Sequence, residues 1–358
     1  MGPPGRLSGR INLVKILDRK KEHLQIANDK AVRFQELTTG FENFHFIHNA
    51  LPEIDLENVD TRIKFLGFEL QSPLMISAIS GGEEFGLELN KDLASVANRA
   101  GIAFSLGSIR PVLEHPKCIA SYQIARKVAP DIPIIANIGG AQLVKSYKSQ
   151  DLIRILEKID VNAISVHLNP LQEALQPEGE PHFSGVSKAI EIMRETLPYP
   201  VIVKEVGFGL SGDVVRRLLK MGIQWVEVAG SGGTSWSRIE YHRIKEKDKK
   251  DIAAQFFEWG IRTTDSLTDA LRMKNLNVIA SGGIDNGLKF AKAIALGARL
   301  AGVAESFLRV RNESGPEGLL RLINVFNETL RIAMFCTGCR NLNEFRGNKS
   351  IISCRKNQ

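Results

Sequence analysis

A stretch of 21 residues, AISVHLNPLQEALQPEGEPHF (163–183), concentrates side chains that could bind an anion, hold a metal ion and move protons. It begins with small and apolar residues, as a buried strand does, and then turns polar. His167, Asn169, Gln172 and Glu173 follow at the end of this strand. An imidazole, two amides and a carboxylate supply hydrogen-bond donors, a metal-seeking oxygen and proton-transfer groups. A loop that is only solvated is the alternative, and similar sites at the other strand ends weaken it.

Glycine-rich or polar turns follow the other strand-like runs. The turns SGGI (281–284), after the seventh run, and Ala301-Gly302, in the eighth, lie just before helical segments. Glycine turns at these places, leading into helix N-termini, form the usual phosphate site of a parallel barrel. Tight left-handed turns without a ligand are the alternative for either loop alone. The remaining turns are AISGG (78–82), GSIR (107–110), NIGG (137–140), KEVG (204–207) and GSGGT (230–234).

Taken together, these turns describe a site for flavin mononucleotide (FMN). The glycine turns would hold its phosphate, Asn137 would offer an amide, and Lys204 would lie beside the pyrimidine edge of the isoalloxazine ring. A fixed cation at that edge favours negative charge on the reduced ring. The alternative for Lys204 is a buried ion pair with a neighbouring carboxylate.

More hydrogen-bond donors are present than a flavin needs. Arg19, Lys20, Arg110, His167 and Asn169 suggest a second, strongly anionic ligand such as a diphosphate. Glu173 would then be the single protein carboxylate on a Mg²⁺ ion whose other ligands are phosphate oxygens and water. An exposed basic helix is the alternative for the charged segment RKKEHL (19–24), in which His23 could also bind an anion.

Eight strand-like runs alternate with helical patterns and must position these groups. Continuous apolar strands indicate a sheet that is buried on both faces, and eight β/α units predict a (β/α)8 TIM barrel with its site at the carboxyl ends of the strands. A doubly wound open sheet is the alternative, but no GxGxxG motif follows the first run. The predicted strands are 73–78, 102–106, 133–138, 163–168, 200–206, 224–229, 277–280 and 299–304. The predicted helices lie around 87–100, 117–129, 150–159, 185–196, 212–221, 264–274, 286–296 and 316–335.

The predicted organisation is one barrel with extensions. Residues 1–17 are expected to be a flexible lead-in, 18–72 an N-terminal arm and barrel cap, 73–340 the FMN-binding barrel and 341–358 a C-terminal tail. The segment 231–262 is an insertion between the sixth strand and its helix, long enough to act as a lid.

The composition favours a protein that binds an anionic ligand and argues against nucleic-acid-binding, membrane-spanning and secreted classes. The chain has 358 residues, 43% of them hydrophobic, and a net charge of +7, which suits an anionic ligand. No basic stripe with interleaved aromatics indicates nucleic acid, and no apolar run approaches the roughly 20 residues of a membrane span. The start of the chain lacks the apolar core of a signal peptide, and four cysteines do not suggest a disulfide framework, so a cytoplasmic protein with structural thiols is expected.

Seven motifs resemble those of the type 2 isopentenyl diphosphate isomerases, flavoenzymes that interconvert isopentenyl and dimethylallyl diphosphate. The resemblance runs from about residue 18 to 346, and HLNPLQE with QPEG is its most specific part. The motifs are RKKEHL (19–24), TTGFENFHFIHNALPEI (38–54), HLNPLQEALQPEGE (167–180), VKEVGFGLS (203–211), AGSGGTSW (229–236), SGGIDNG (281–287) and MFCTGC (334–339).

The resemblance implies a role for individual positions. Gln172 and His167 would be catalytic, with Gln172 beside the reacting carbons, and Glu173 would bind Mg²⁺. Substrate contacts are implied at Arg19, Lys20, Ser108, Ile109, Arg110, His167, Asn169 and Gln172. Flavin contacts are implied at Ala78, Ile79, Ser80, Ser108, Asn137, Lys204, Thr234, Gly282, Gly283, Ala301 and Gly302. Two departures from the family pattern are Ile79-Ser80 for Met-Thr, which keeps the hydroxyl, and Ile109 for Gln, which loses an amide.

The resemblance also implies chemistry and partners. FMN, reduced by NADPH, would act as acid and base in a 1,3-proton shift with no net redox change. The chain would form a homo-oligomer, a tetramer on family grounds. The rivals are an α-hydroxy-acid oxidase, an inosine-monophosphate-type dehydrogenase and a non-catalytic flavin-binding module. The first wants a histidine on a late loop and the second a cysteine on a barrel loop, and the sequence places neither there. A module that only binds flavin would not need both a carboxylate that binds a metal ion and a buried amide.

Overall fold

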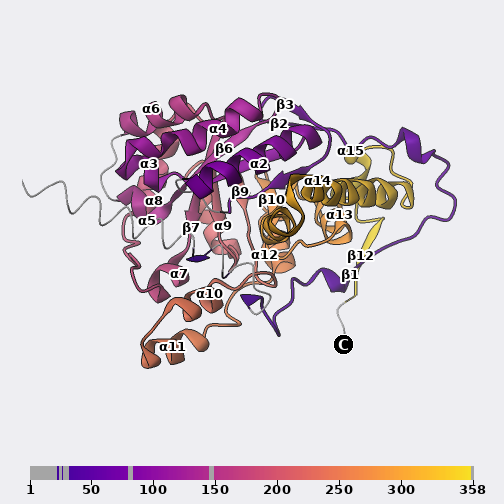
Figure 1. Cartoon of the computed structure of the whole chain (residues 1–358). Helices are drawn as coiled ribbons and strands as arrows, with labels where there is room; N and C mark the ends of the chain where they lie inside the picture. Colours follow the sequence, from indigo (N-terminus) through magenta and orange to yellow (C-terminus); the bar gives the residue numbers. More distant parts are fainter. Residues whose placement is uncertain (1–21, 24–25, 27–31, 80–83, 145–148, 356–358) are drawn as a thin grey trace, which may run out of the picture.

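Eight short parallel strands close into a barrel, and helices cover its outside (Figure 1). The computed structural model describes residues 22–23, 26, 32–79, 84–144 and 149–355. The strands follow chain order around the barrel, and the last pairs with the first. The predicted (β/α)8 barrel is therefore confirmed. Its strands are β4 (Leu74–Ile76), β5 (Ala103–Ser108), β6 (Ile134–Gly139), β7 (Ala163–Leu168), β8 (Val201–Glu205), β9 (Trp225–Glu227), β10 (Asn277–Ser281) and β11 (Leu300–Val303).

The barrel strands are buried on both faces. Every residue of β6, which reads IIANIG, and of β8, which reads VIVKE, is buried. Side chains that point outward pack under the helices, and side chains that point inward fill the barrel. A polar residue inside such a strand therefore requires a buried partner, and Lys204 and Glu205 at the end of β8 are two such residues.

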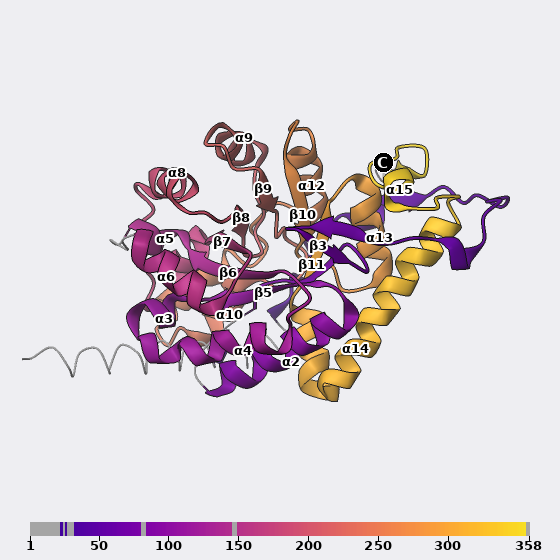
Figure 2. The same cartoon turned by 90° about the horizontal axis from the view of Figure 1, so that it is seen from above.

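The helices around the barrel lie close to their predicted positions. Seen from above, the long α14 runs along the outside of the barrel and packs against α13 and α2 (Figure 2). Within the described ranges, no helix is long and apolar enough to cross a membrane. The helices are α2 (Glu84–Ala100), α3 (Arg110–Glu114), α4 (Ala120–Val128), α5 (Gly140–Val144), α6 (Ser149–Ile159), α7 (Pro170–Leu175), α8 (Val186–Thr196), α9 (Gly212–Lys220), α12 (Thr263–Leu271), α13 (Gly287–Leu296) and α14 (Glu305–Phe335).

Helix α14 begins eleven residues before the predicted helix at 316–335. Its two segments meet at Gly315, which has φ 66° and ψ −174°, and Pro316 follows. A glycine-proline pair reads as a helix boundary, because glycine adopts positive φ freely and proline favours the first turn of a new helix. The sequence pattern therefore revealed only the second segment.

A hairpin covers the barrel at the amino ends of the strands. It consists of β2 (Ile63–Phe65) and β3 (Phe68–Leu70), joined by a tight turn. Phe65 packs edge-on against Trp225, the first residue of β9, with ring centroids 5.0 Å apart. This end of the barrel is thus closed by apolar side chains, which leaves the carboxyl ends of the strands as the open face.

The described part of segment 341–358 contains a helix and a strand. Helix α15 spans Leu342–Phe345, and β12 (Ile352–Cys354) pairs antiparallel with β1 (Phe44–Phe46) of the N-terminal arm. Two further backbone bonds, Ile47 N–H to Ile351 O and Arg355 N–H to Asn43 O, continue the pairing on either side. The end of the chain therefore anchors the arm to the barrel.

The two ends of the insertion after β9 are hydrogen-bonded to each other where they leave the barrel. Ser231 N–H donates to Ile261 O, and Thr263 N–H donates back to Ser231 O. Between these points lie α10 (Trp236–Arg243) and α11 (Lys247–Ala254). The Glu258 carboxylate accepts the backbone N–H groups of residues 35, 36 and 37 at 2.8 to 3.1 Å. The insertion and the arm are thereby held together over the open face.

We predict that Ile352→Ala lowers the free energy of unfolding by about 2 kcal/mol or more, because it removes buried apolar atoms from β12. Cys354→Ala, an exposed position on the same strand, should change it by less than about 0.5 kcal/mol. Urea unfolding of both variants measures the difference. Equal effects would contradict the anchoring role of β12.

Candidate active site at the carboxyl ends of the barrel strands

Two adjoining cavities open at the carboxyl ends of the strands. With the solvent space at their mouths included, they enclose about 900 and 860 Å³. We call the first the glycine-lined cavity and the second the amide-lined cavity. Both are lined by His23, Ala78, Ile79, Lys204, Val206 and Trp236.

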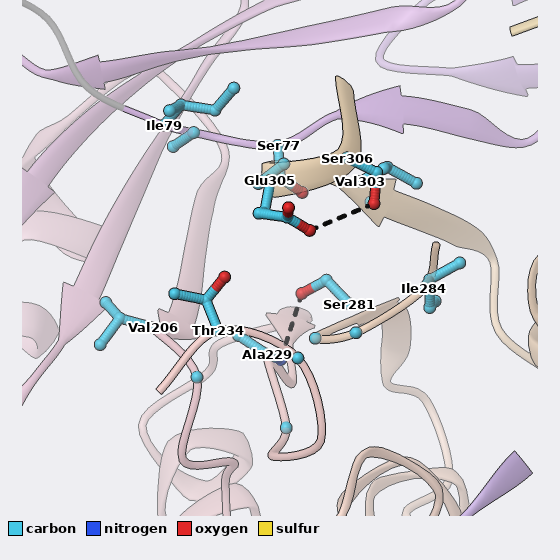
Figure 3. Close-up of a pocket in the computed structure, with 18 of the residues that line it drawn as sticks. Ser77, Ile79, Val206, Ala229, Thr234, Ser281, Ile284, Val303, Glu305 and Ser306 are labelled. Atoms are coloured by element: carbon cyan, nitrogen blue, oxygen red, sulfur yellow. Dashed lines mark hydrogen bonds between the residues drawn. The ribbon is translucent and has the colours of Figure 1, made fainter. Parts of the chain in front are cut away.

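The glycine-lined cavity is built on two turns whose backbones touch (Figure 3). A Cβ atom on Gly282 would lie 2.1 Å from Gly230 O, and one on Gly233 would lie 2.6 Å from the Gly283 backbone. Gly282 and Gly283 also have φ values of 100° and 64°, which side chains disfavour. Both residues therefore adopt the left-handed turns considered as the alternative, and the same turns also line this cavity. The Thr234 hydroxyl, which Figure 3 shows at this cavity, is buried and has no partner, so it fits a missing acceptor such as a phosphate.

Lys204 lies between the two cavities and is buried. Its Nζ donates to Glu205 O at 2.6 Å and lies 3.8 Å from Glu227 Oε1. The same Glu227 oxygen accepts hydrogen bonds from Ser77 at 2.9 Å and Ser281 at 2.8 Å. The ion pair considered as an alternative role for Lys204 is therefore present. It does not exclude a ligand contact, because Lys204 also lines both cavities.

The Glu205 carboxylate turns away from the cavities and organises the loop after β8. One of its oxygens accepts the backbone N–H groups of residues 206 to 209 at 2.5 to 3.2 Å. Burial raises the pKa of Glu205 to about 7, against the opposing effects of these N–H groups and of Lys204. This loop carries Val206 and Gly207 into the lining of the glycine-lined cavity.

The amide-lined cavity gathers the polar end of β7. His167 Nδ1 lies 2.6 Å from Asn137 Oδ1, which joins the ends of β6 and β7. Asn169 Nδ2 donates to Gln172 Oε1 at 3.0 Å and to Glu173 Oε1 at 3.1 Å. The residues predicted to meet at one strand end therefore contact one another.

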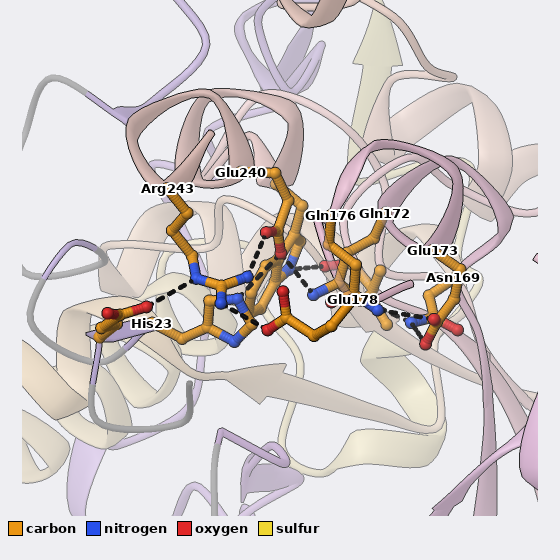
Figure 4. Close-up of polar contacts among 11 residues, drawn as sticks. His23, Asn169, Gln172, Glu173, Gln176, Glu178, Glu240 and Arg243 are labelled. Atoms are coloured by element: carbon orange, nitrogen blue, oxygen red, sulfur yellow. Dashed lines mark hydrogen bonds and ion pairs between the residues drawn. The ribbon is translucent and has the colours of Figure 1, made fainter. Parts of the chain in front are cut away.

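Gln172 is held from its other side by a buried carboxylate that the sequence did not reveal. Its Nε2 donates to Glu240 Oε1 at 3.2 Å, and His23 Nε2 lies 2.9 Å from the same oxygen (Figure 4). Arg243 donates to the other Glu240 oxygen at 2.7 Å and also pairs with Glu22 and Glu178. Burial alone would raise the pKa of Glu240, but the contacts with His23 and Arg243 hold it below its usual value.

Helix α10, which carries Glu240 and Arg243, begins at Trp236, the last residue of the motif AGSGGTSW. Their spacing of three residues puts them on one face of the helix, and this spacing is the sequence signal that could have revealed the pair. His23, which the sequence suggested could bind an anion, lies beside the Glu240 carboxylate and also lines both cavities.

Glu173, the predicted Mg²⁺ ligand, lines the amide-lined cavity. Its Oε2 accepts from Gln176 Nε2 at 2.6 Å and from Glu180 N–H at 2.8 Å. The neighbouring Asn169 Oδ1 is buried and has no hydrogen-bond partner. Among the described residues, no group of three or more His, Cys, Asp or Glu side chains could hold a metal. A Mg²⁺ ion fits here only with ligand oxygens or water completing its shell, as predicted for Glu173.

Most of the predicted site residues line one of the cavities. Ile109 and Ala301 are fully buried and line neither, so any contact with a ligand would come from their backbone groups. Arg19, Lys20 and Ser80 lie outside the described residues. The lining residues are Ala78, Ile79, Ser108, Arg110, Asn137, His167, Asn169, Gln172, Glu173, Lys204, Thr234, Gly282, Gly283 and Gly302.

The fold and part of the sequence match FMN proteins. The family profile described as FMN-dependent dehydrogenase matches residues 153–352. A flavocytochrome b2 variant with benzoylformate superposes with a TM-score of 0.67 at 18% identity, covering 91% of this chain and 79% of that one. A mandelate oxidase variant gives a TM-score of 0.66 at 16% identity, covering 96% and 99%. At these identities the structures show the fold alone, and the class is that of the FMN-dependent (β/α)8 barrels.

Two relatives with much higher sequence identity are both isopentenyl-diphosphate delta-isomerases. The isopentenyl-diphosphate delta-isomerase of Pyrococcus abyssi is 41% identical over 342 residues, 94% of this chain and 92% of the relative. That of Rickettsia peacockii is 42% identical over 330 residues, 92% and 95% of the two chains. The chain belongs to the FMN-dependent, type 2 isopentenyl-diphosphate delta-isomerase family. The resemblance drawn from the sequence motifs is confirmed.

We predict that Glu205→Gln removes a pH dependence of stability. The folded state binds this proton up to a pH of about 7 and the unfolded chain only up to about 4.5, so native stability falls as pH rises between these values. The full effect is roughly 3 kcal/mol at about 1.4 kcal/mol per pKa unit. The glutamine oxygen can still accept the four N–H groups. Urea unfolding at pH 4.5 and pH 8 should show native stability falling by at least about 1 kcal/mol more than that of the variant.

Glu69→Gln, an exposed position on β3, serves as the control and should follow the native pH dependence. Parallel pH profiles for the native protein and Glu205→Gln would contradict the assigned protonation of Glu205.

Proposed function

We propose that this chain interconverts isopentenyl and dimethylallyl diphosphate by a 1,3-proton shift. The observation that carries the proposal is the pair of adjoining cavities that share Lys204, in a chain that is 41% identical over 342 residues to an isopentenyl-diphosphate delta-isomerase. FMN would occupy the glycine-lined cavity, and the diphosphate substrate would occupy the amide-lined cavity. When bound and reduced by NADPH, FMN would supply an electron-rich face and an acid-base group.

Gln172 would orient the reacting carbons. Its amide oxygen accepts from Asn169 and its amide nitrogen donates to Glu240, so both ends of the amide are fixed. A side chain held at both ends loses little further freedom when the substrate binds, which favours a precise approach. Glu240 in turn is fixed by His23 and Arg243, so the arm, α7 and α10 close the site together.

The diphosphate would be held by His167, Asn169 and Arg110, with Arg19 and Lys20 from the arm. Arg110 lines the amide-lined cavity and pairs with Glu114 at 2.7 Å and Glu180 at 3.3 Å. Glu180 N–H also donates to Glu173, so the anion contacts and the proposed Mg²⁺ ligand belong to one network. Because the diphosphate would lie next to the carboxylates of Glu173 and Glu180, this network supports a role for Mg²⁺ in neutralising the negative charge. Assembly as a tetramer, on family grounds, and a cytoplasmic location, expected from the four cysteines as structural thiols, complete the proposal.

The decisive experiment is an anaerobic assay of isopentenyl diphosphate with the FMN-loaded protein, NADPH and Mg²⁺. Formation of dimethylallyl diphosphate that requires both FMN and NADPH supports the proposal. Oxidation of an α-hydroxy acid with no isomerisation would favour the oxidase alternative and would contradict it.

We predict that Gln172→Ala lowers kcat by about 10² or more, the scale of a lost positioned proton-transfer or orienting group, and leaves FMN bound. Turnover and the visible flavin spectrum measure the two effects separately. Gln123→Ala, which removes the same side chain from the outer helix α4, should retain native turnover. Native turnover by Gln172→Ala would refute the orienting role.

We further predict that Glu173→Gln raises the Mg²⁺ concentration needed for half-maximal activity by about tenfold or more, because a carboxylate ligand becomes a neutral amide. FMN affinity should be unchanged, since Glu173 lines only the amide-lined cavity. A Mg²⁺ titration of activity, with FMN binding measured in parallel, tests this. An unchanged Mg²⁺ requirement would place the ion elsewhere.

A further inference from the structure

A short piece of the N-terminal arm runs across the rim of the glycine-lined cavity. Phe34 N–H donates to Gly233 O at 3.0 Å, and Ser235 N–H donates to Val32 O at 2.8 Å. Arg33 and Thr234 are therefore opposed in an antiparallel bridge. Opposed residues of such a bridge point to the same face, and both of these line the cavity.

Both residues carry a buried polar atom that has no partner. These atoms are the Arg33 Nε–H donor and the Thr234 hydroxyl oxygen. Leaving such atoms unpaired costs free energy, so in native proteins they nearly always have a partner. Two of them on opposed residues at one cavity wall indicate a single missing ligand that accepts hydrogen bonds.

The charges around Arg33 also leave its guanidinium available. Its Nη2 lies 3.0 Å from Asp285 and 3.3 Å from Glu305. Each of these carboxylates has a second cation: Lys289 lies 2.8 Å from Asp285, and Arg309 lies 3.5 Å from Glu305. Arg33 is thus not the sole countercharge of either carboxylate. Both carboxylates contact Nη2, and Nε is left without a partner.

We propose that Arg33 binds the phosphate group of FMN through its Nε–H, opposite the Thr234 hydroxyl and above the glycine turns at 230–233 and 282–283. The proposal rests on the FMN site of the proposed function and adds a ligand-binding residue from outside the barrel. The Nε–H of a guanidinium makes a charge-assisted hydrogen bond to a phosphate oxygen, and the bridge to Thr234 fixes the backbone of Arg33. The arm segment 32–35 then covers the phosphate end of the cofactor.

The test compares FMN with riboflavin, which lacks the phosphate. Apo protein is titrated with each flavin, and quenching of flavin fluorescence gives both dissociation constants. Arg33→Ala should raise the Kd for FMN at least tenfold and that for riboflavin less than threefold, so the preference for FMN falls. Thr234→Val, which removes only the hydroxyl, should lower this preference in the same direction.

Arg309→Ala is the matched control, because it removes the other guanidinium beside Glu305 but does not line the cavity. It should leave the ratio of the two dissociation constants within twofold of native. Arg33→Lys keeps the charge without the Nε–H and should lose part of the preference, which also guards against a folding defect in the alanine variant.

An equal loss of FMN and riboflavin binding in Arg33→Ala and Arg33→Lys would show that the arm acts only as a cover, and would overturn the assignment while leaving the FMN site intact. Failure of the native protein to bind FMN would instead overturn the proposed function, and this assignment with it.

Discussion

The contact on which the site depends is the buried pair of Lys204 and Glu227. One oxygen of Glu227 meets the lysine ammonium at 3.8 Å and two serine hydroxyls at 2.8 and 2.9 Å. These four side chains come from β8, β9 and β10 and from the residue after β4, so one carboxylate joins strands on several sides of the barrel mouth. A charge buried this deeply must be paired, and the pairing fixes where each strand end lies. The glycine turns that follow β9 and β10 are held in place by the same contact.

Three further carboxylates organise the rest of the open face in the same way. Glu205 gathers the backbone N–H groups of its own loop, Glu240 gathers Gln172, His23 and Arg243, and Glu258 gathers backbone N–H groups of the arm. Each lies at the end of a barrel strand or in the insertion, next to loops that have few apolar contacts to fix them. A carboxylate accepts several strong hydrogen bonds at once, so one residue can fix several segments. These contacts thereby fix the loop after β8, the insertion and the N-terminal arm relative to one another.

The sequence predicted the barrel because its signals are local. Apolar runs such as AISVHL and the glycine turns after them give strand, turn and helix without reference to distant residues. The grouping of His167, Asn169, Gln172 and Glu173 was predictable for the same reason, since all four lie within seven positions. The partners of these groups were not predictable. Glu240 lies 68 positions from Gln172, and Asp285 lies 252 positions from Arg33, and no local pattern links such pairs.

The pairing of Lys204 also bears on how the two proposed anions, FMN and the diphosphate, would bind in adjoining cavities. An isolated lysine would act as a charge whose effect falls slowly with distance, but a lysine 3.8 Å from a carboxylate acts as a dipole whose effect falls faster. Lys204 therefore serves as a local hydrogen-bond donor to whatever lies against it in either cavity. The amide-lined cavity has further polar and charged residues of its own, Arg110, His167 and Glu173. In the proposed function, the diphosphate would therefore be held mainly by these residues rather than by the charge of Lys204.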